Sequence, residues 1–176
     1  MTESGQQQAL WAGLQNGGYV LILPHASALA AAQDLPELAP EDCARRDHLS
    51  DRGRQELERL NGEMRSHNIT VGRVLTSHDC RCIETAGIMF GQAQPWSIID
   101  DARTANPDLA REGRVALIEA ISRWTSADNL ALVTHQETIR EALGIAPEPA
   151  ELLVIEPLGE SGFRVLGRLR PNRTDR

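Results

Sequence analysis

Two apolar segments far apart in the chain each run into a histidine. Residues 19–24 precede His25, and residues 129–134 precede His135. Short apolar runs of this kind, bounded by turn-forming residues, are typical of fully buried strands. The carboxyl ends of parallel strands meet at one edge of a sheet. The pattern therefore requires a sheet with two covered faces and predicts that both imidazoles lie at the same edge.

Strand-like and helix-like segments alternate along the rest of the chain. This alternation predicts an α/β fold, a three-layer α/β/α sandwich with a mostly parallel central sheet, in one domain over residues 1–176. We expect residues 26–48 to be mostly loop. The expected helices are 8–16, 50–66, 79–91, 107–124 and 136–143; the expected strands are 19–24, 73–77, 96–100, 129–134 and a closing hairpin of 151–156 with 163–169.

Composition excludes some classes of function. The 176 residues are 41% hydrophobic and carry a net charge of −7, which weighs against sequence-independent nucleic-acid binding. An acidic protein can still hold an anionic substrate in a locally positive pocket. The polar start is unlike a signal peptide, and no apolar run is long enough to span a membrane. We expect a cytoplasmic protein that does not bind membranes; its oligomeric state stays open.

The three cysteines, Cys43, Cys80 and Cys82, are an odd number. Cys80 and Cys82 lack the two-residue spacer of common zinc and redox motifs, so we expect no metal site. A bridge from Cys43 to the Cys80 region is one arrangement to be tested against the distance between these cysteines.

Four motifs occur in order, and three of them follow expected strands. Pro-His-Ala stands at 24–26, Leu-Ser-Asp-Arg-Gly-Arg at 49–54, a Ser-x-x-x-Arg-x-x-x-Thr-Ala pattern at 77–86, and a strand-His-helix segment at 133–140. Together they resemble the histidine phosphatase superfamily, which includes the phosphoglycerate mutases. The resemblance implies a phosphoglycerate mutase-like fold and metal-independent, cofactor-free phosphoryl chemistry.

The resemblance also implies roles for individual residues. His25 would attack phosphorus and become phosphohistidine, because imidazole is nucleophilic near neutral pH. Arg81 would grip the phosphoryl oxygens, and His135 would donate to them as their charge develops. The backbone N–H of Gln136, at a helix start, and the hydroxyl of Ser77 are further candidate phosphate contacts.

A carboxylic acid must protonate the leaving oxygen. Asp101 follows the expected strand 96–100, and Glu137 follows His135 closely in sequence; both are candidates, and we favour Asp101. Asp100 and Asp79 are alternatives.

The first motif departs from the family, since Pro24 stands where an arginine is expected. Losing one such donor costs about 2.7–4 kcal/mol of transition-state stabilisation, or about 10²–10³ in rate. Arg45, Arg46, His48 or His78 would be the replacements.

Two functions compete on these grounds. The first is hydrolysis of a phosphomonoester or phosphohistidine, with a small phosphorylated molecule or a phosphoprotein as substrate. The second is a catalytically silent domain that binds a phosphate ligand or has a regulatory role. Outside the motif roles, we expect Glu84 to lie in solvent and His67 to be exposed.

Overall fold

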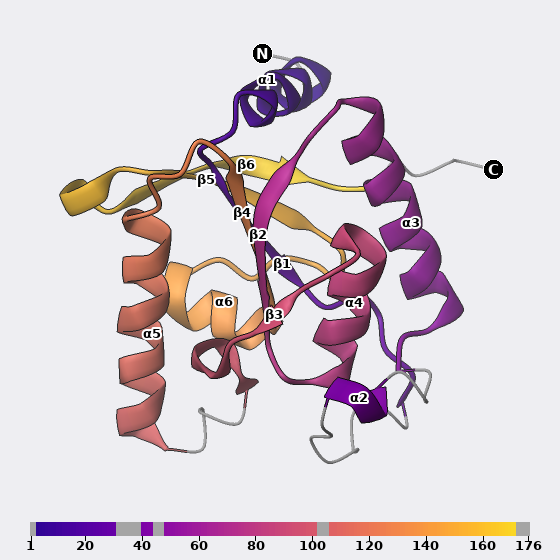
Figure 1. Cartoon of the computed structure of the whole chain (residues 1–176), viewed down its shortest axis with the longest axis vertical. Helices are drawn as coiled ribbons and strands as arrows, with labels where there is room; N and C mark the ends of the chain where they lie inside the picture. The colour runs from indigo at the N-terminus through magenta and orange to yellow at the C-terminus, as the bar shows by residue number, and fades with distance from the viewer. Residues whose placement is uncertain (1–2, 31–39, 44–47, 102–105, 172–176) are drawn as a thin grey trace.

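Within the described residues, a six-stranded mixed sheet lies at the centre of the protein (Figure 1). The computed structural model describes residues 3–30, 40–43, 48–101 and 106–171. The strand order is β3-β2-β4-β1-β5-β6. The strands are β1 Val20–Pro24, β2 Val71–Thr76, β3 Gln94–Pro95, β4 Asn129–Thr134, β5 Leu152–Pro157 and β6 Phe163–Leu169.

The part of the sheet that carries the motifs is parallel. β1 and β2 both pair with β4 in parallel, and β3 pairs with β2 in parallel at the edge of the sheet. β5 runs antiparallel to β1 and to β6. The carboxyl ends of β1, β2 and β4 therefore meet at one edge, which confirms the expected α/β fold with a mostly parallel sheet.

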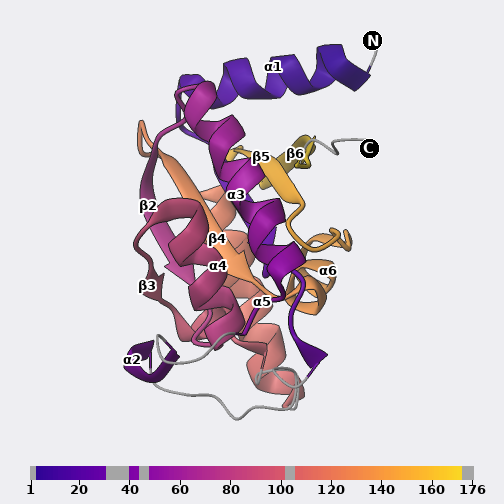
Figure 2. The same ribbon diagram turned by 90° about the vertical axis from the view of Figure 1, so that its right-hand side faces the viewer.

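Helices cover both faces of the sheet (Figures 1 and 2). One face is covered by α1, α3 and α4, and the other by α5 and α6. The described helices are α1 Glu3–Gln15, α2 Pro40–Cys43, α3 Asp51–Ser66, α4 Cys80–Phe90, α5 Pro107–Ser122 and α6 Gln136–Leu143. Among the described residues, no helix is long and apolar enough to cross a membrane.

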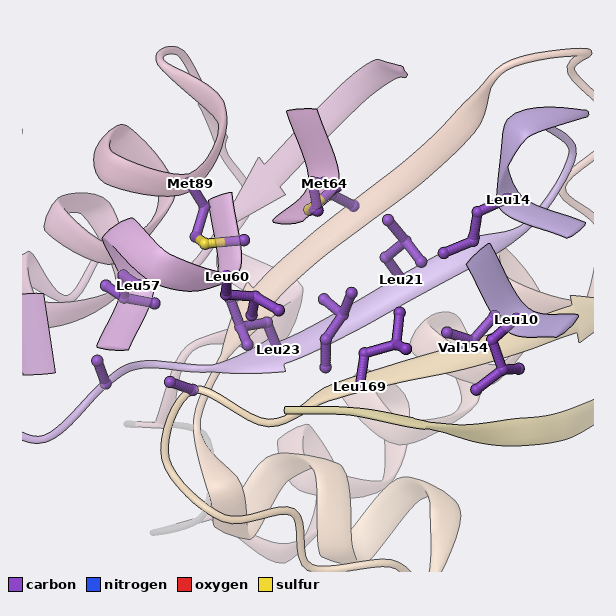
Figure 3. Close-up of a cluster of buried hydrophobic side chains, with 14 of the residues drawn as sticks. Leu10, Leu14, Leu21, Leu23, Leu57, Leu60, Met64, Met89, Val154 and Leu169 are labelled. Carbon is purple, nitrogen blue, oxygen red and sulfur yellow. The ribbon is translucent and has the colours of Figure 1, made fainter. Parts of the chain in front are cut away.

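The core explains why β1 reads as an unbroken apolar run. Leu21 and Leu23 point into a cluster with α1, α3 and α4, shown in Figure 3. Val20 and Ile22 point to the opposite face, into the cluster under α5 and α6. All four are fully buried, and burying each side chain contributes about 1.5–3 kcal/mol. This packing fixes β1, and with it the position of the residue that follows.

The expected strand at 96–100 is wrong. β3 ends at Pro95, and Ser97–Ile99 form a 3₁₀ turn instead. Proline has no N–H to donate to a ladder, and it is therefore tolerated mainly in edge strands such as β3. The expected helix over 107–124 ends earlier, at Ser122. The 3₁₀ turn matters because it delivers Asp100 and Asp101 beside the end of β2.

Helix ends follow the sequence closely near the site. The Ser50 hydroxyl caps α3 by accepting from the N–H of Gly53 at 3.1 Å. Asp79 caps α4, and Gly144 ends α6 in the left-handed conformation that glycine favours.

Candidate active site

His25 is held at the end of β1 by two main-chain contacts. Its N–H donates to the carbonyl of Thr134 at 3.0 Å, which continues the pairing of β1 with β4. Its ring nitrogen Nδ1 lies 2.8 Å from the carbonyl oxygen of Ala26. A carbonyl only accepts, so Nδ1 carries the ring proton and Nε2 keeps its lone pair. The ring nitrogen with the available lone pair is thus Nε2.

His135 lies beside His25 at the end of β4. The two rings meet edge to face, with centroids 5.5 Å apart. Burial lowers the pKa of His135 to about 4, against the opposing charges of Asp101 and Asp79. Burial also lowers the pKa of His25, against its bond to Ala26. Both imidazoles are therefore neutral near pH 7, which is the state a nucleophile needs.

Ser77 connects His135 to the partly buried carboxylate of Asp100. The Ser77 hydroxyl lies 3.1 Å from Nε2 of His135 and 3.0 Å from Oδ1 of Asp100. The same Asp100 oxygen accepts from the N–H of His78 at 2.7 Å, and its other oxygen lies 3.0 Å from Nδ1 of His78. Asp100 thus positions the loop after β2. Ser77 contacts His135 here; its expected role as a phosphate contact stays a prediction.

Arg81 lies on the first turn of α4, and its guanidinium already has a partner. Nε donates to Oδ1 of Asp79 at 2.9 Å, and Nη2 donates to Oδ2 at 2.6 Å. The pair is only partly exposed, at 15% for Arg81 and 21% for Asp79. Hydrogen bonds from Arg81 hold the pKa of Asp79 at about 2 even though burial opposes the shift. The charges of both residues act on both imidazoles.

The two candidate acids occupy different surroundings. The Asp101 carboxylate acts electrostatically on His25, His135 and Arg81. Glu137 is exposed and forms an ion pair with Arg140 along the same helix. Both carboxylates are exposed, and Glu137 is paired with a neighbour on its own helix. The role of Asp101 as the acid stays a prediction.

Gln136 begins α6, so its N–H belongs to the first turn, where a helix leaves amides without intrahelical partners. Its side chain donates to the carbonyl of Pro147 at 2.6 Å, which ties α6 to the following loop. The amide remains a candidate phosphate contact.

Four residues were candidates to replace the missing arginine: Arg45, Arg46, His48 and His78. Arg45 and Arg46 lie outside the described residues. His48 is buried at 2% exposure, and its Nε2 has no hydrogen-bond partner among the described residues. His78 is 37% exposed and pairs with Asp100. Of the two described candidates, His78 is the one that lies next to a site residue, because it follows Ser77 in the chain.

Sequence reasoning missed two supporting residues of α4. Glu84 does not lie in solvent: it pairs with Arg54 at 2.7 Å and accepts from the N–H groups of His48 and Leu49. Thr85 accepts from the N–H of Ala26 at 3.1 Å, which holds the turn after His25. The motif at 77–86 includes Thr85 and could have indicated its role. The partners of Glu84 lie in another segment of the chain, so no local pattern indicates them.

The cysteines divide into a bridge and a buried thiol. Cys43 of α2 forms a disulfide with Cys80, the first residue of α4. Cys82 is free and buried, and burial raises the pKa of its thiol. Its Sγ lies 3.3 Å from the carbonyl oxygen of Thr134. Within the described part of the chain, no group of three or more His, Cys, Asp or Glu residues is arranged to hold a metal ion.

His67 is not exposed as expected. It is half-buried at the end of α3 and stacks on Trp11, with ring centroids 4.7 Å apart. It lies at the opposite end of α3 from the motif at 49–54 and takes no part in the site.

The α/β fold matches those of solved histidine phosphatases and other phosphoglycerate mutase-like structures. A SixA protein histidine phosphatase complexed with tungstate matches with a TM-score of 0.59 at 10% identity, over 87% of this chain and 97% of that one. SixA from Agrobacterium tumefaciens matches with a TM-score of 0.59 at 21% identity, over 88% of this chain and 99% of that one. Mycobacterial glucosyl-3-phosphoglycerate phosphatase complexed with VO3 matches with a TM-score of 0.55 at 14% identity, over 85% and 97%.

The sequence itself matches no family model and no curated protein. The likeness to known proteins is therefore one of fold.

Proposed function

We propose that this protein is a phosphatase that transfers a phosphoryl group to Nε2 of His25 and then to water. The substrate is a phosphomonoester or a phosphohistidine, carried by a small molecule or a protein. The observation that carries the proposal is the bond from Nδ1 of His25 to Ala26, which leaves Nε2 as the nucleophile beside a second neutral imidazole.

The reaction has two steps, and the bonds balance in each. In the first, the lone pair of His25 Nε2 forms a P–N bond as the P–O or P–N bond to the leaving group breaks. Asp101 gives a proton to the leaving atom. In the second, water attacks phosphorus, the P–N bond to His25 breaks, and Asp101 takes the proton back from water. Inorganic phosphate leaves, and His25 returns to its first state.

Charge stabilisation is the weak part of this site. Arg81 is the group that would face the phosphoryl oxygens. Ser77 donates its proton to Asp100, so the single N–H of neutral His135 points to the Ser77 oxygen, and His135 can donate to a phosphoryl oxygen only by leaving that contact. The resemblance places an arginine at position 24, and Pro24 offers no donor there. We therefore expect slow turnover, with a rate about 10²–10³ below that of a site with both arginines.

The test compares hydrolysis of p-nitrophenyl phosphate by the wild type, His25→Ala and His67→Ala. His67 provides a matched control because it is a histidine on the far end of α3 that stacks on Trp11. We expect activity in the wild type and His67→Ala, and none above background in His25→Ala. A base-stable, acid-labile phosphoryl adduct is expected in the two active proteins. Equal rates in all three proteins would refute the proposal.

A silent phosphate-binding domain is the second candidate. Pro24 favours it, because the site lacks the donor that the family resemblance places at this position and that transition-state stabilisation needs. This function predicts that wild type and His25→Ala hydrolyse the ester equally slowly, and that Pro24→Arg is clearly active.

A further inference from the structure

The pairing between Asp79 and Arg81 is built into the start of α4. Oδ1 of Asp79 accepts from the Arg81 N–H at 2.8 Å and from Nε at 2.9 Å, while Oδ2 accepts from Nη2 at 2.6 Å. One carboxylate thus caps the helix and occupies the Nε–Nη2 edge of the guanidinium. That edge is one of the two that bind an oxyanion through paired N–H groups.

Neighbouring contacts hold this turn in place. The Asp79 N–H donates to the Ser77 hydroxyl at 3.2 Å. Cys80, between the two charged residues, is bonded to Cys43. Cys82, which follows Arg81, is buried against the end of β4. The pair is therefore unlike an exposed ion pair between two long, mobile side chains.

The electrostatic consequence concerns phosphate binding. An oxyanion that binds Arg81 along the same edge must displace the Asp79 carboxylate or sit beside it. Both choices oppose binding, since displacement breaks two charge-assisted hydrogen bonds and co-occupancy places like charges together. The two charges of the pair cancel, so the turn offers a dianion little net attraction.

We propose that Asp79 acts as a built-in competitor for Arg81, which keeps the affinity of the site for dianionic tetrahedral oxyanions low. The inference rests on the proposed function in placing Arg81 against the phosphoryl group. Asp79 is thereby a specificity-determining residue: it favours phosphoryl groups that carry less negative charge or bring a cation to meet the carboxylate.

The experiment measures tungstate binding by isothermal titration calorimetry at pH 7. Asp79→Asn keeps a side-chain oxygen that caps α4 but removes the charge. We expect its tungstate affinity to exceed that of the wild type by roughly 10- to 100-fold, the size of one or more charge-assisted contacts. Asp51→Asn removes one charge at the exposed start of α3 and is the matched control. We expect it to stay within about twofold of the wild type.

Two further variants test whether the gain in tungstate affinity depends on Arg81 and on the charge of Asp79. Asp79→Asn combined with Arg81→Gln should lose the gain, because the freed donor is gone. Asp79→Ser, which retains a capping hydroxyl, should reproduce the gain if Asp79→Asn folds poorly. A tungstate affinity of Asp79→Asn and Asp79→Ser no higher than that of Asp51→Asn would overturn the inference.

Binding also separates this inference from the proposed function. His25→Ala lacks the nucleophile, so no phosphoryl transfer can occur. We expect the Asp79→Asn change to tighten tungstate binding in that background as well. If turnover is absent but the gain is present, the inference stands and the phosphatase proposal fails. If turnover is present but the gain is absent, the reverse holds.

Discussion

The rings of His25 and His135 meet edge to face, with centroids 5.5 Å apart and planes inclined at 78°. Each ring comes from the end of a different strand, β1 or β4, and these strands pair in parallel with Pro24 opposite Thr134. Strand pairing thus sets the spacing of the imidazoles. Because both rings are largely buried, a proton on either ring is costly, and this cost should appear in the pH dependence of stability.

Stability should fall between pH 6.5 and 4. The pKa of His135 is about 4 in the folded protein and near 6.5 unfolded. Over this range the unfolded chain binds more protons, so the free energy of unfolding decreases as pH falls and levels off above pH 6.5. The loss due to His135 is on the order of 3 kcal/mol.

Urea unfolding of the wild type and His135→Gln at pH 7.0, 5.5 and 4.5 tests this. The variant should show a clearly shallower decline. Asp79, whose pKa is lowered to about 2, adds its own loss only below about pH 4. Identical slopes for the two proteins would contradict the buried, neutral state of His135.

The choice of acid can be tested with two leaving groups. Phenolate needs a proton to leave, whereas p-nitrophenolate departs almost unaided. If Asp101 is the acid, Asp101→Asn should lower kcat on phenyl phosphate by about 10²-fold or more and on p-nitrophenyl phosphate much less. Glu137→Gln should change neither rate more than about threefold, because Glu137 is exposed and paired with Arg140. The opposite ranking of the two variants would reassign the role.

Restoring an arginine at position 24 should strengthen the site. Pro24→Arg supplies the donor that the family resemblance places there, and we expect kcat/KM for p-nitrophenyl phosphate to rise by up to about 10²–10³. Pro24→Ala restores only the backbone N–H and serves as the control. Equal gains in the two variants would show that removal of proline, and not the guanidinium, changes the activity.

The Cys43–Cys80 bridge should stabilise the fold substantially. It closes a loop with a sequence separation of 37, which in the chain-entropy treatment corresponds to about 4 kcal/mol. Cys43→Ser should lower the free energy of unfolding by that order. Addition of a dithiol reductant should destabilise the wild type equally and leave the variant unchanged. A wild type insensitive to reductant would argue that the bridge does not contribute.

The sequence predicts those parts of the site that depend on residues close together in the chain, such as apolar runs, turn residues and helix caps. Apolar runs fixed β1 and β4, and turn residues marked their ends, so the meeting of His25 and His135 followed from topology. The capping of α3 by Ser50 was likewise readable, because a capping hydroxyl acts within one turn. The parallel pairing of β1 and β2 with β4, which brings the ends of these strands to one edge, agrees with these predictions.

The parts that sequence reasoning missed depend on distant partners or on competition between nearby ones. Glu84 was expected in solvent, yet it accepts N–H groups 35 and 36 residues away, which no local pattern reveals. The Asp79–Arg81 pair had a signal, since aspartate is a preferred helix cap. The motif predicts that Arg81 binds phosphate, whereas in the structure its guanidinium binds the neighbouring Asp79.

Gly53 is a motif residue at which only glycine fits, because a larger side chain would collide with the main chain of Ser27. A Cβ at this position would lie 2.4 Å from the carbonyl oxygen of Ser27, whose chain follows His25, and main chain cannot give way cheaply. Gly53→Ala should therefore destabilise the protein by about 1–3 kcal/mol and lower activity by shifting that segment. Gly62 lies in the same helix with open space around its Cβ, so Gly62→Ala should stabilise by about 0.5–1 kcal/mol. Thermal and urea unfolding of the pair would show opposite signs; stabilisation by both substitutions would mean that α3 does not pack against Ser27 as described.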